Sequence, residues 1–254
     1  MRLVVLGDPV DHSRSPAIQT AALEACGIEG TYTARRVDET GMVNAVDEVR
    51  YGRLAGANVT MPHKQLAFEL ADRVTEAALR SGAVNTLVLR DGEVWGYNTD
   101  VEGIRAVWGS AHLPTDRPVL VLGAGGAAAG AVVAVGDHAI TVSARRDQAA
   151  AELIRRTRTD GSIVPWGTPL EGAVVVNATP IGMGTESLPP ELLEMASGFF
   201  DLTYGPAESP SVRYARELGI PTADGKELLL AQAARSFEIW TGVPAPIDVM
   251  RSAF

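Results

Sequence analysis

Val119-Leu-Val-Leu-Gly-Ala-Gly-Gly-Ala-Ala128 joins four apolar residues, typical of a buried strand, to a glycine-rich turn. An Ala- and Val-rich segment continues from the turn to about Val135, and we predict that it is a helix. Residues 139–143 supply a second apolar strand. Because strand, turn, helix and strand follow one another in this order, the stretch predicts a βαβ unit with parallel strands.

The glycine spacing in this turn, Gly123-x-Gly125-x-x-Ala128, matches the loop that binds dinucleotides in βαβ units. The first glycine allows the tight turn, the second lets a pyrophosphate approach the backbone, and the small third residue lets the helix pack on the strand. A tight turn without a ligand is the alternative. The complete strand–helix–strand context favours cofactor binding, with the contacts at Gly123, Ala124, Gly125, Gly126, Ala127 and Ala128.

The end of the second strand reads Ser143-Ala-Arg-Arg146, where an NAD-binding protein usually has an acidic residue for the ribose hydroxyl. Guanidinium groups bind phosphate in a bidentate manner, so Arg145 and Arg146 favour the 2′-phosphate of NADP. The alternatives are that one or both arginines are merely solvated and that the nearby Asp147 weakens the preference.

Composition excludes several classes of function. The 254 residues suit one large or two modest domains, and a formal net charge of −9 argues against nucleic acid or an anionic membrane as partner. Cys26 is the single cysteine and the four histidines show no metal-ligand spacing, so we expect no metal site. The N-terminus turns after a short apolar run, and apolar runs fall short of the roughly 20 residues that span a bilayer. We therefore expect a cytoplasmic protein.

Short apolar runs alternate with amphipathic stretches along the whole chain, which predicts an α/β fold with mostly parallel sheets. Asp91-Gly92, between two strand-like segments, predicts a hairpin. The main expected strands are 2–6, 31–37, 54–59, 85–90, 174–177 and 199–202. The main expected helices are 16–26, 40–50, 62–70, 101–108 and a long amphipathic helix that begins near residue 223.

Lys64 ends the stretch Asn58-Val-Thr-Met-Pro-His-Lys64, and among the 22 basic residues only it and Lys226 are lysines. A lysine can exchange a proton, whereas an arginine stays charged. Asp100, in Tyr97-Asn-Thr-Asp100, offers a carboxylate at another expected helix start. Together with the nucleotide loop, these two residues predict proton transfer coupled to a cofactor reaction.

Each of these polar residues also has an ordinary structural explanation. Ser15 followed by Pro16 fits an N-cap followed by the first helical residue. Thr99-x-x-Glu102 fits a capping box, which would make Asp100 an ordinary acid of the first turn. Asn85 fits a turn and Lys64 a solvated helix position, so the residues taken one by one leave both explanations open.

Seven segments, in the same order along nearly the whole chain, resemble the motifs of the shikimate dehydrogenase family. They are residues 7–16, 56–64, 81–86, 96–100, 123–128, 177–183 and 223–225 with Gln232. The resemblance implies a two-domain α/β enzyme that reduces 3-dehydroshikimate reversibly to shikimate with NADPH. Residues 1–101, joined by the C-terminal helix at 225–254, would bind the substrate, and residues 102–224 would form a Rossmann-like NADP-binding domain.

The resemblance also implies a role for individual residues. Lys64 and Asp100 would be the catalytic pair, and Ser13 and Ser15 would hold the shikimate carboxylate. Substrate hydroxyls and the ring would meet the side chains of Thr60, Asn85, Gln232 and Tyr204. The remaining cofactor contacts would come from Ala144, Arg145, Arg146, Thr179, Met183 and Gly225. A homodimer is a candidate assembly.

Three positions depart from the family pattern: Ala129 stands where an arginine is common, Ala144-Arg-Arg replaces Asn-Arg-Thr, and Leu228 replaces a methionine. These departures concern cofactor affinity and NADP selectivity and leave the catalytic pair unchanged. The alternatives are a quinate or quinate/shikimate dehydrogenase and a ligand sensor of the same fold without catalysis. The pair of serines and the arginine turn favour shikimate and NADP, and the presence of both Lys64 and Asp100 favours an enzyme.

Overall fold

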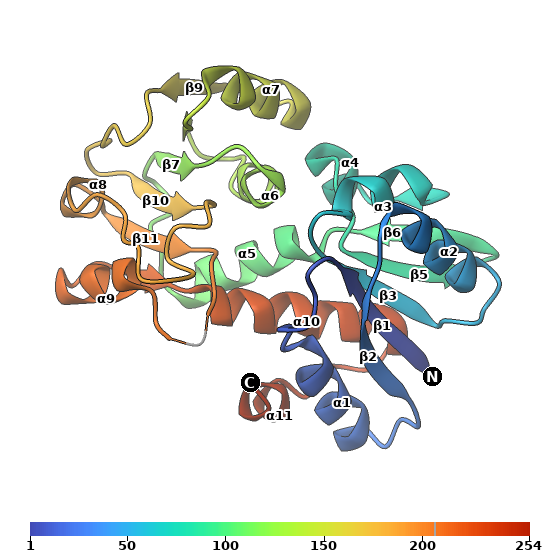
Figure 1. The fold of residues 1–254 in the computed structure, drawn as a ribbon. Helices are drawn as coiled ribbons and strands as arrows, with labels where there is room; N and C mark the ends of the chain where they lie inside the picture. The colour runs from blue at the N-terminus through green and yellow to red at the C-terminus, as the bar shows by residue number, and fades with distance from the viewer. Residues whose placement is uncertain (206) are drawn as a thin grey trace. The chain divides into compact units, whose positions relative to one another are not determined.

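The computed structural model describes residues 1–205 and 207–254 and divides them into two compact units (Figure 1). The first unit combines Met1–Thr99 with Leu230–Phe254, and the second is Asp100–Leu229. The chain passes between the units inside two helices, α5 (Thr99–Ser110) and α10 (Gly225–Thr241).

The first unit is built on a six-stranded mixed sheet in the order β2-β1-β3-β5-β6-β4. Its strands are β1 (Arg2–Gly7), β2 (Thr31–Arg36), β3 (Gly56–Val59), β4 (Arg73–Val74), β5 (Thr86–Arg90) and β6 (Glu93–Tyr97). Its helices are α1 (Ser15–Ala25), α2 (Glu39–Arg50), α3 (Lys64–Leu70), α4 (Glu76–Ser81) and α11 (Ile247–Ser252), with the second half of α10. β1 runs parallel to β2 and β3, whereas β5 pairs antiparallel with β3 and β6.

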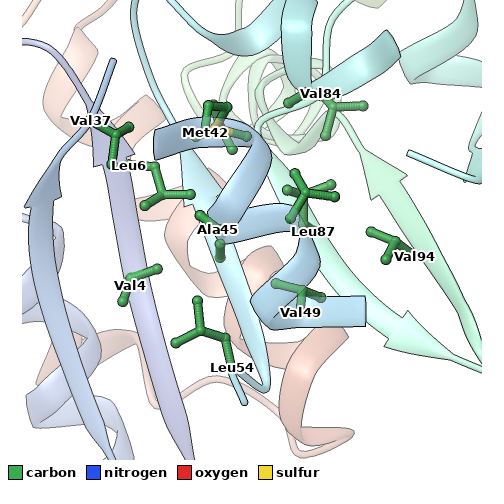
Figure 2. Close-up of a cluster of buried hydrophobic side chains, with 14 of the residues drawn as sticks. Val4, Leu6, Val37, Met42, Ala45, Val49, Leu54, Val84, Leu87 and Val94 are labelled. Carbon is green, nitrogen blue, oxygen red and sulfur yellow. The ribbon is translucent and has the colours of Figure 1, made fainter. Parts of the chain in front are cut away.

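One face of this sheet carries a core beneath α2 (Figure 2). Met42, Ala45 and Val49 recur at helical spacing along α2 and point toward apolar side chains of the sheet, among them Val4 and Leu6 of β1. All five side chains are buried. Burial of this stripe, rather than intrinsic helix propensity, supplies most of the stability of such a helix.

The C-terminal half of α10 packs closely against the same sheet at Gly56. The indole nitrogen of Trp240 donates to the carbonyl of Leu87 at 3.0 Å. A Cβ on Gly56 would lie only 2.2 Å from that nitrogen, so only glycine permits the approach. Gln19 of α1 donates to the carbonyl of Ala233 at 2.9 Å and ties α1 to the same helix.

The second unit is built on a parallel six-stranded sheet in the order β12-β11-β10-β7-β8-β9. Its strands are β7 (Val119–Leu122), β8 (Ile140–Ser143), β9 (Gly161–Val164), β10 (Val174–Asn177), β11 (Gly198–Asp201) and β12 (Thr222–Ala223). Its helices, besides most of α5, are α6 (Gly126–Ala134), α7 (Asp147–Thr157), α8 (Glu191–Glu194) and α9 (Pro210–Glu217). This order is that of doubly wound dinucleotide-binding sheets, and it reverses direction between β7 and β10.

The structure confirms the α/β class, the main strands and the hairpin at Asp91-Gly92. The cap of α1 differs from the expectation. Arg14 is the N-cap and Ser15 is already helical, so the Ser15 hydroxyl is not used in capping. Among residues 1–205 and 207–254, no helix combines the length and apolar character needed to cross a membrane.

The close approach of Gly56 to Trp240 gives a stability prediction. We expect Gly56→Ala to lower the free energy of unfolding by roughly 1–3 kcal/mol, because the added methyl group overpacks the contact with α10. Apart from the chain neighbours and backbone of α5, no described atom lies within 4 Å of an added Cβ on Gly109 in that helix. Gly109→Ala is therefore the matched control and should be neutral or slightly stabilising. Thermal melts of both variants check this, and equal melting temperatures would contradict it.

Candidate active site

The nucleotide loop begins where β7 ends and lies at the reversal of strand order. Gly123 has a φ of +108°, and a Cβ there would lie 2.9 Å from the carbonyl oxygen of Ala178 in the loop after β10. Only glycine accommodates both the left-handed conformation and this contact. The loops that follow β7 and β10 therefore meet at Gly123, as the first position of the dinucleotide motif requires.

The start of α6 has room and hydrogen-bond donors for a diphosphate. Gly125 is the N-cap in an extended conformation, and as a glycine it has no side chain with which to cap the helix. Among the described residues, apart from chain neighbours and the backbone of α6, nothing lies within 4 Å of an added Cβ on Gly125 or Gly126, so the space beside these two glycines is open. Ala128 is fully buried, where it lets α6 pack on the sheet. These residues fit the diphosphate of a dinucleotide.

The arginine turn follows β8 directly. Ala144 is buried, whereas Arg145 and Arg146 are exposed and Arg146 is the extended N-cap of α7. Within the described part of the chain, neither guanidinium group forms an ion pair. Both groups are thus available for an anionic ligand, and both stand at the end of the strand next to β7.

A cavity of about 140 Å³ lies within the second unit. Its lining includes Gly182, Thr203, Tyr204 and Gly225. Gly225 begins α10, and a Cβ there would lie 2.1 Å from the carbonyl oxygen of Thr203, so the backbone approach requires glycine. The cavity brings Tyr204 and Gly225 together at the carboxyl end of this sheet. Thr179 and the exposed Met183 lie on the loop after β10, the strand beside β7.

Lys64 is the first residue of α3 and is half-buried. The preceding residue, His63, is buried and its Nε2 lies 2.8 Å from the carbonyl oxygen of Val37. The carbonyl of Lys64 accepts from the amide of Val84 at 2.9 Å, and Thr60 is tied to β1 through its amide. The backbone around Lys64 is thus held on several sides.

In the second unit, Asp100 lies in the first turn of α5. An added Cβ on Gly130 of α6 would lie 3.9 Å from the Cβ of Asp100.

Asn85 and Gln232 are brought together through Thr99. The Oδ1 of Asn85 accepts from the amide of Thr99 at 2.8 Å and from the hydroxyls of Thr99 and Thr86 at 3.1 Å. The Thr99 hydroxyl also lies 3.5 Å from the Oε1 of Gln232. Because the side-chain Oδ1 of Asn85 already accepts from these donors, its side-chain nitrogen, Nδ2, is the group that remains for a ligand hydroxyl.

A further layer of buried polar side chains, which the sequence did not predict, lies behind these residues. The amide nitrogen of Asn58 lies 3.0 Å from the carbonyl of Asn85 and from the hydroxyls of Thr86 and Ser236. The hydroxyl of Tyr32 donates to the Oδ1 of Asn58 at 2.7 Å. The one signal in the sequence was an asparagine inside a short apolar strand.

Ser15 lies beside Tyr32 of this layer. Burial raises the pKa of the Tyr32 hydroxyl far above its usual value, and a hydrogen bond with Ser15 opposes part of that rise. Ser15 itself is buried, and its amide lies 3.3 Å from the hydroxyl of the half-buried Ser13. Both hydroxyls therefore gather at the start of α1, where amide groups favour an anion.

Comparison with known proteins identifies the family of this chain. A family model for the shikimate dehydrogenase substrate binding domain matches residues 5–87, and one for the shikimate 5'-dehydrogenase C-terminal domain matches residues 225–253. A shikimate dehydrogenase (NADP(+)) of Methanocella arvoryzae is 39% identical over 98% of this chain and 96% of the relative. Another, of Desulforamulus reducens, is 37% identical over 98% of this chain and 92% of the relative.

The solved structures point the same way. The shikimate 5-dehydrogenase of Thermus thermophilus, in complex with NADP(H) and shikimate, has a TM-score of 0.91 to this structure at 35% sequence identity. The match covers 100% of this chain and 98% of that one. Similarity at this level over whole chains, with the nucleotide loop at the reversal of strand order, shows that the chain belongs to the shikimate dehydrogenase family.

Proposed function

We propose that this chain catalyses the reversible NADPH-dependent reduction of 3-dehydroshikimate to shikimate, a step of the shikimate pathway toward aromatic amino acids. The observation that carries the proposal is the open glycine loop at the reversal of strand order, in a chain that matches NADP-dependent shikimate dehydrogenases along its whole length. The first unit would bind the substrate and the second would bind NADP.

Different residues of the chain would bind different parts of NADP. Backbone amides of residues 123–128 would receive the diphosphate. Arg145 and Arg146 would pair with the 2′-phosphate, and Ala129, which is fully buried, contributes no charge there. Thr179, Met183 and the Gly225 backbone would face the nicotinamide end. When bound, NADPH supplies the hydride.

Two sets of polar side chains would orient the substrate, one at its carboxylate and one at its ring hydroxyls. Ser13 and Ser15, at the start of α1, would bind the carboxylate, and Thr60, the Asn85 amide nitrogen and Gln232 would bind ring hydroxyls. Tyr204 of the second unit would border the ring. The hydrogen bonds among Asn58, Asn85 and Thr99 support this arrangement, because side chains held by buried partners keep one orientation.

Lys64 would move the proton. In reduction its Nζ would donate to the carbonyl oxygen as that oxygen gains charge, and in oxidation it would take the proton back from the hydroxyl. Asp100 would orient Lys64 and accept from a neighbouring substrate hydroxyl. A positioned general acid contributes about 10²–10⁴ to the rate, which sets the size of the expected effect.

A cytoplasmic location would suit an enzyme of this pathway, and we include it in the proposal. A homodimer stays a prediction, which light scattering coupled to size-exclusion chromatography would test.

The proposed reaction is tested with the purified protein by following absorbance of the reduced nicotinamide. We expect NADP reduction with shikimate to be much faster than with quinate, and NADP to be preferred over NAD. Preference for quinate or NAD would contradict the specificity. Binding of ligands without turnover for every pair would instead favour the sensor.

The role of Lys64 is tested by two substitutions. We expect Lys64→Ala and Lys64→Arg each to lower kcat by about 10²–10⁴, because an arginine keeps the charge but does not release a proton at neutral pH. Shikimate affinity should change modestly. Gln65→Ala, on the same helix and exposed, is the control. Near-normal turnover in Lys64→Arg would remove proton donation from the mechanism.

The role of the arginine turn is tested through cofactor selectivity. We expect Arg145→Ala combined with Arg146→Ala to raise the KM for NADP at least tenfold while leaving the KM for NAD within about twofold, since a charge-assisted pair is worth roughly 1.5–3 kcal/mol. Arg155→Ala changes an exposed arginine further along α7 and should leave both constants unchanged. A parallel rise for both cofactors would show that the turn does not read the 2′-phosphate.

A further inference from the structure

Two loops of the second unit carry proposed contacts to the cofactor and substrate, and they follow neighbouring strands. The β10 loop, residues 178–183, contains Thr179 and Met183, and the β11 loop, residues 202–205, contains Tyr204. Figure 1 shows β10 and β11 side by side, and Asn177 at the end of one is in register with Asp201 at the end of the other. Both side chains are fully buried.

Asp201 holds its own loop directly. Its Oδ1 accepts from the amide of Thr203 at 3.0 Å and from the hydroxyl of Thr203 at 2.8 Å. The carbonyl of the same threonine lies against the backbone of Gly225, where an added Cβ would be 2.1 Å away. The position of Thr203 therefore decides how the chain passes Gly225.

Asp201 also acts on the β10 loop, through Asn177. The Nδ2 of Asn177 donates to the Oδ1 of Asp201 at 2.9 Å and to the carbonyl of Ile181 at 2.7 Å. A carboxylate only accepts hydrogen bonds, so the amide nitrogen of Asn177 must face it. The Asn177 Oδ1 then faces the opposite way and accepts from the amide and hydroxyl of Thr179, at 3.1 Å and 2.7 Å.

The other carboxyl oxygen of Asp201 lies under the β10 loop. Gly182 has a φ of +105°, and an added Cβ would lie 3.2 Å from the Oδ2 of Asp201 and 2.7 Å from the hydroxyl oxygen of Ser209. Burial raises the pKa of Asp201, and the hydrogen bonds from Thr203 and Asn177 oppose that rise. Within the described residues, neither Oδ2 nor the Ser209 hydroxyl makes a hydrogen bond.

We propose that Asp201 is a positioning residue for cofactor binding: its buried carboxyl group holds the β11 loop through Thr203 and the β10 loop through Asn177. The inference rests on the proposed function, since it assumes that these loops border NADP. Asp201 itself need not touch the cofactor. Its effect on Thr179 passes through the orientation of one amide group.

The experiment compares Asp201→Asn and Asp201→Ala with the parent chain. Thr157→Val is the control, because it removes a buried hydroxyl of the same unit that, among the described residues, bonds only within its own helix, at Leu153 and Ile154. The readouts are NADPH affinity by nicotinamide fluorescence, shikimate affinity, KM and kcat, and hydrogen exchange of individual amides. Exchange at Thr179 is decisive, since that amide bonds to Asn177 and not to Asp201.

We expect Asp201→Ala to raise the Kd for NADPH about tenfold, as the loss of charge-assisted hydrogen bonds implies. Asp201→Asn, which keeps one acceptor oxygen, should give about a threefold rise, with faster exchange at Thr179 in both variants. Shikimate affinity should stay within about twofold and kcat should fall less than KM rises. Thr157→Val should lower the melting temperature without these changes.

Unchanged exchange at Thr179 and unchanged NADPH affinity in Asp201→Asn would overturn the proposal. So would a parallel loss of NADPH and shikimate affinity that tracks the melting temperature, as in a general destabilisation. If Asp201→Ala does not fold, Asp201→Asn alone decides. A parent chain that fails to oxidise shikimate with NADP would contradict the proposed function, whereas exchange at Thr179 tests Asp201 without any turnover.

Discussion

The parallel pairing of β7 with β10 is the constraint on which the cofactor side of this protein depends. Connections leave these two strands in opposite directions, so the loops at their carboxyl ends face each other across the point of reversal. Gly123 lies at that point, and its contact with the Ala178 carbonyl leaves no room for a side chain. The open start of α6 is a consequence, because the chain turns there without a capping side chain to fill the space.

In the first unit, polar side chains are buried and ordered inside an otherwise apolar sheet. Asn58, Asn85 and Thr99 are buried, and each would cost free energy if left without a partner. Their mutual hydrogen bonds satisfy them and at the same time fix which atoms face outward. Stability and the orientation of the proposed substrate contacts therefore rest on the same bonds, just as Asp201 and Asn177 join two loops in the second unit.

The local sequence pattern predicted much of the secondary structure. The apolar run before Gly123 and the Asp91-Gly92 turn each depend on neighbouring residues alone, and both were predicted correctly. Five helices were not predicted, namely α4, α7, α8, α9 and α11. Such helices gain their stability from packing that local propensity does not reveal. The shift of the α1 cap from Ser15 to Arg14 has a similar cause, because side-chain identity suggests a cap but the path of the preceding turn selects it.

The sequence by itself determined the α/β class, the nucleotide loop and the family, because these depend on spacings of a few residues and on motifs that follow one another in a fixed order along the chain. Tertiary structure alone decided that Tyr32, Asn58 and Ser236 stand behind the proposed substrate contacts, and that Asp201 reaches Thr179 through Asn177. Ser236 is 178 residues from Asn58 along the chain. Strand order and helix packing decide which residues form hydrogen bonds over such separations, and the local sequence predicts neither.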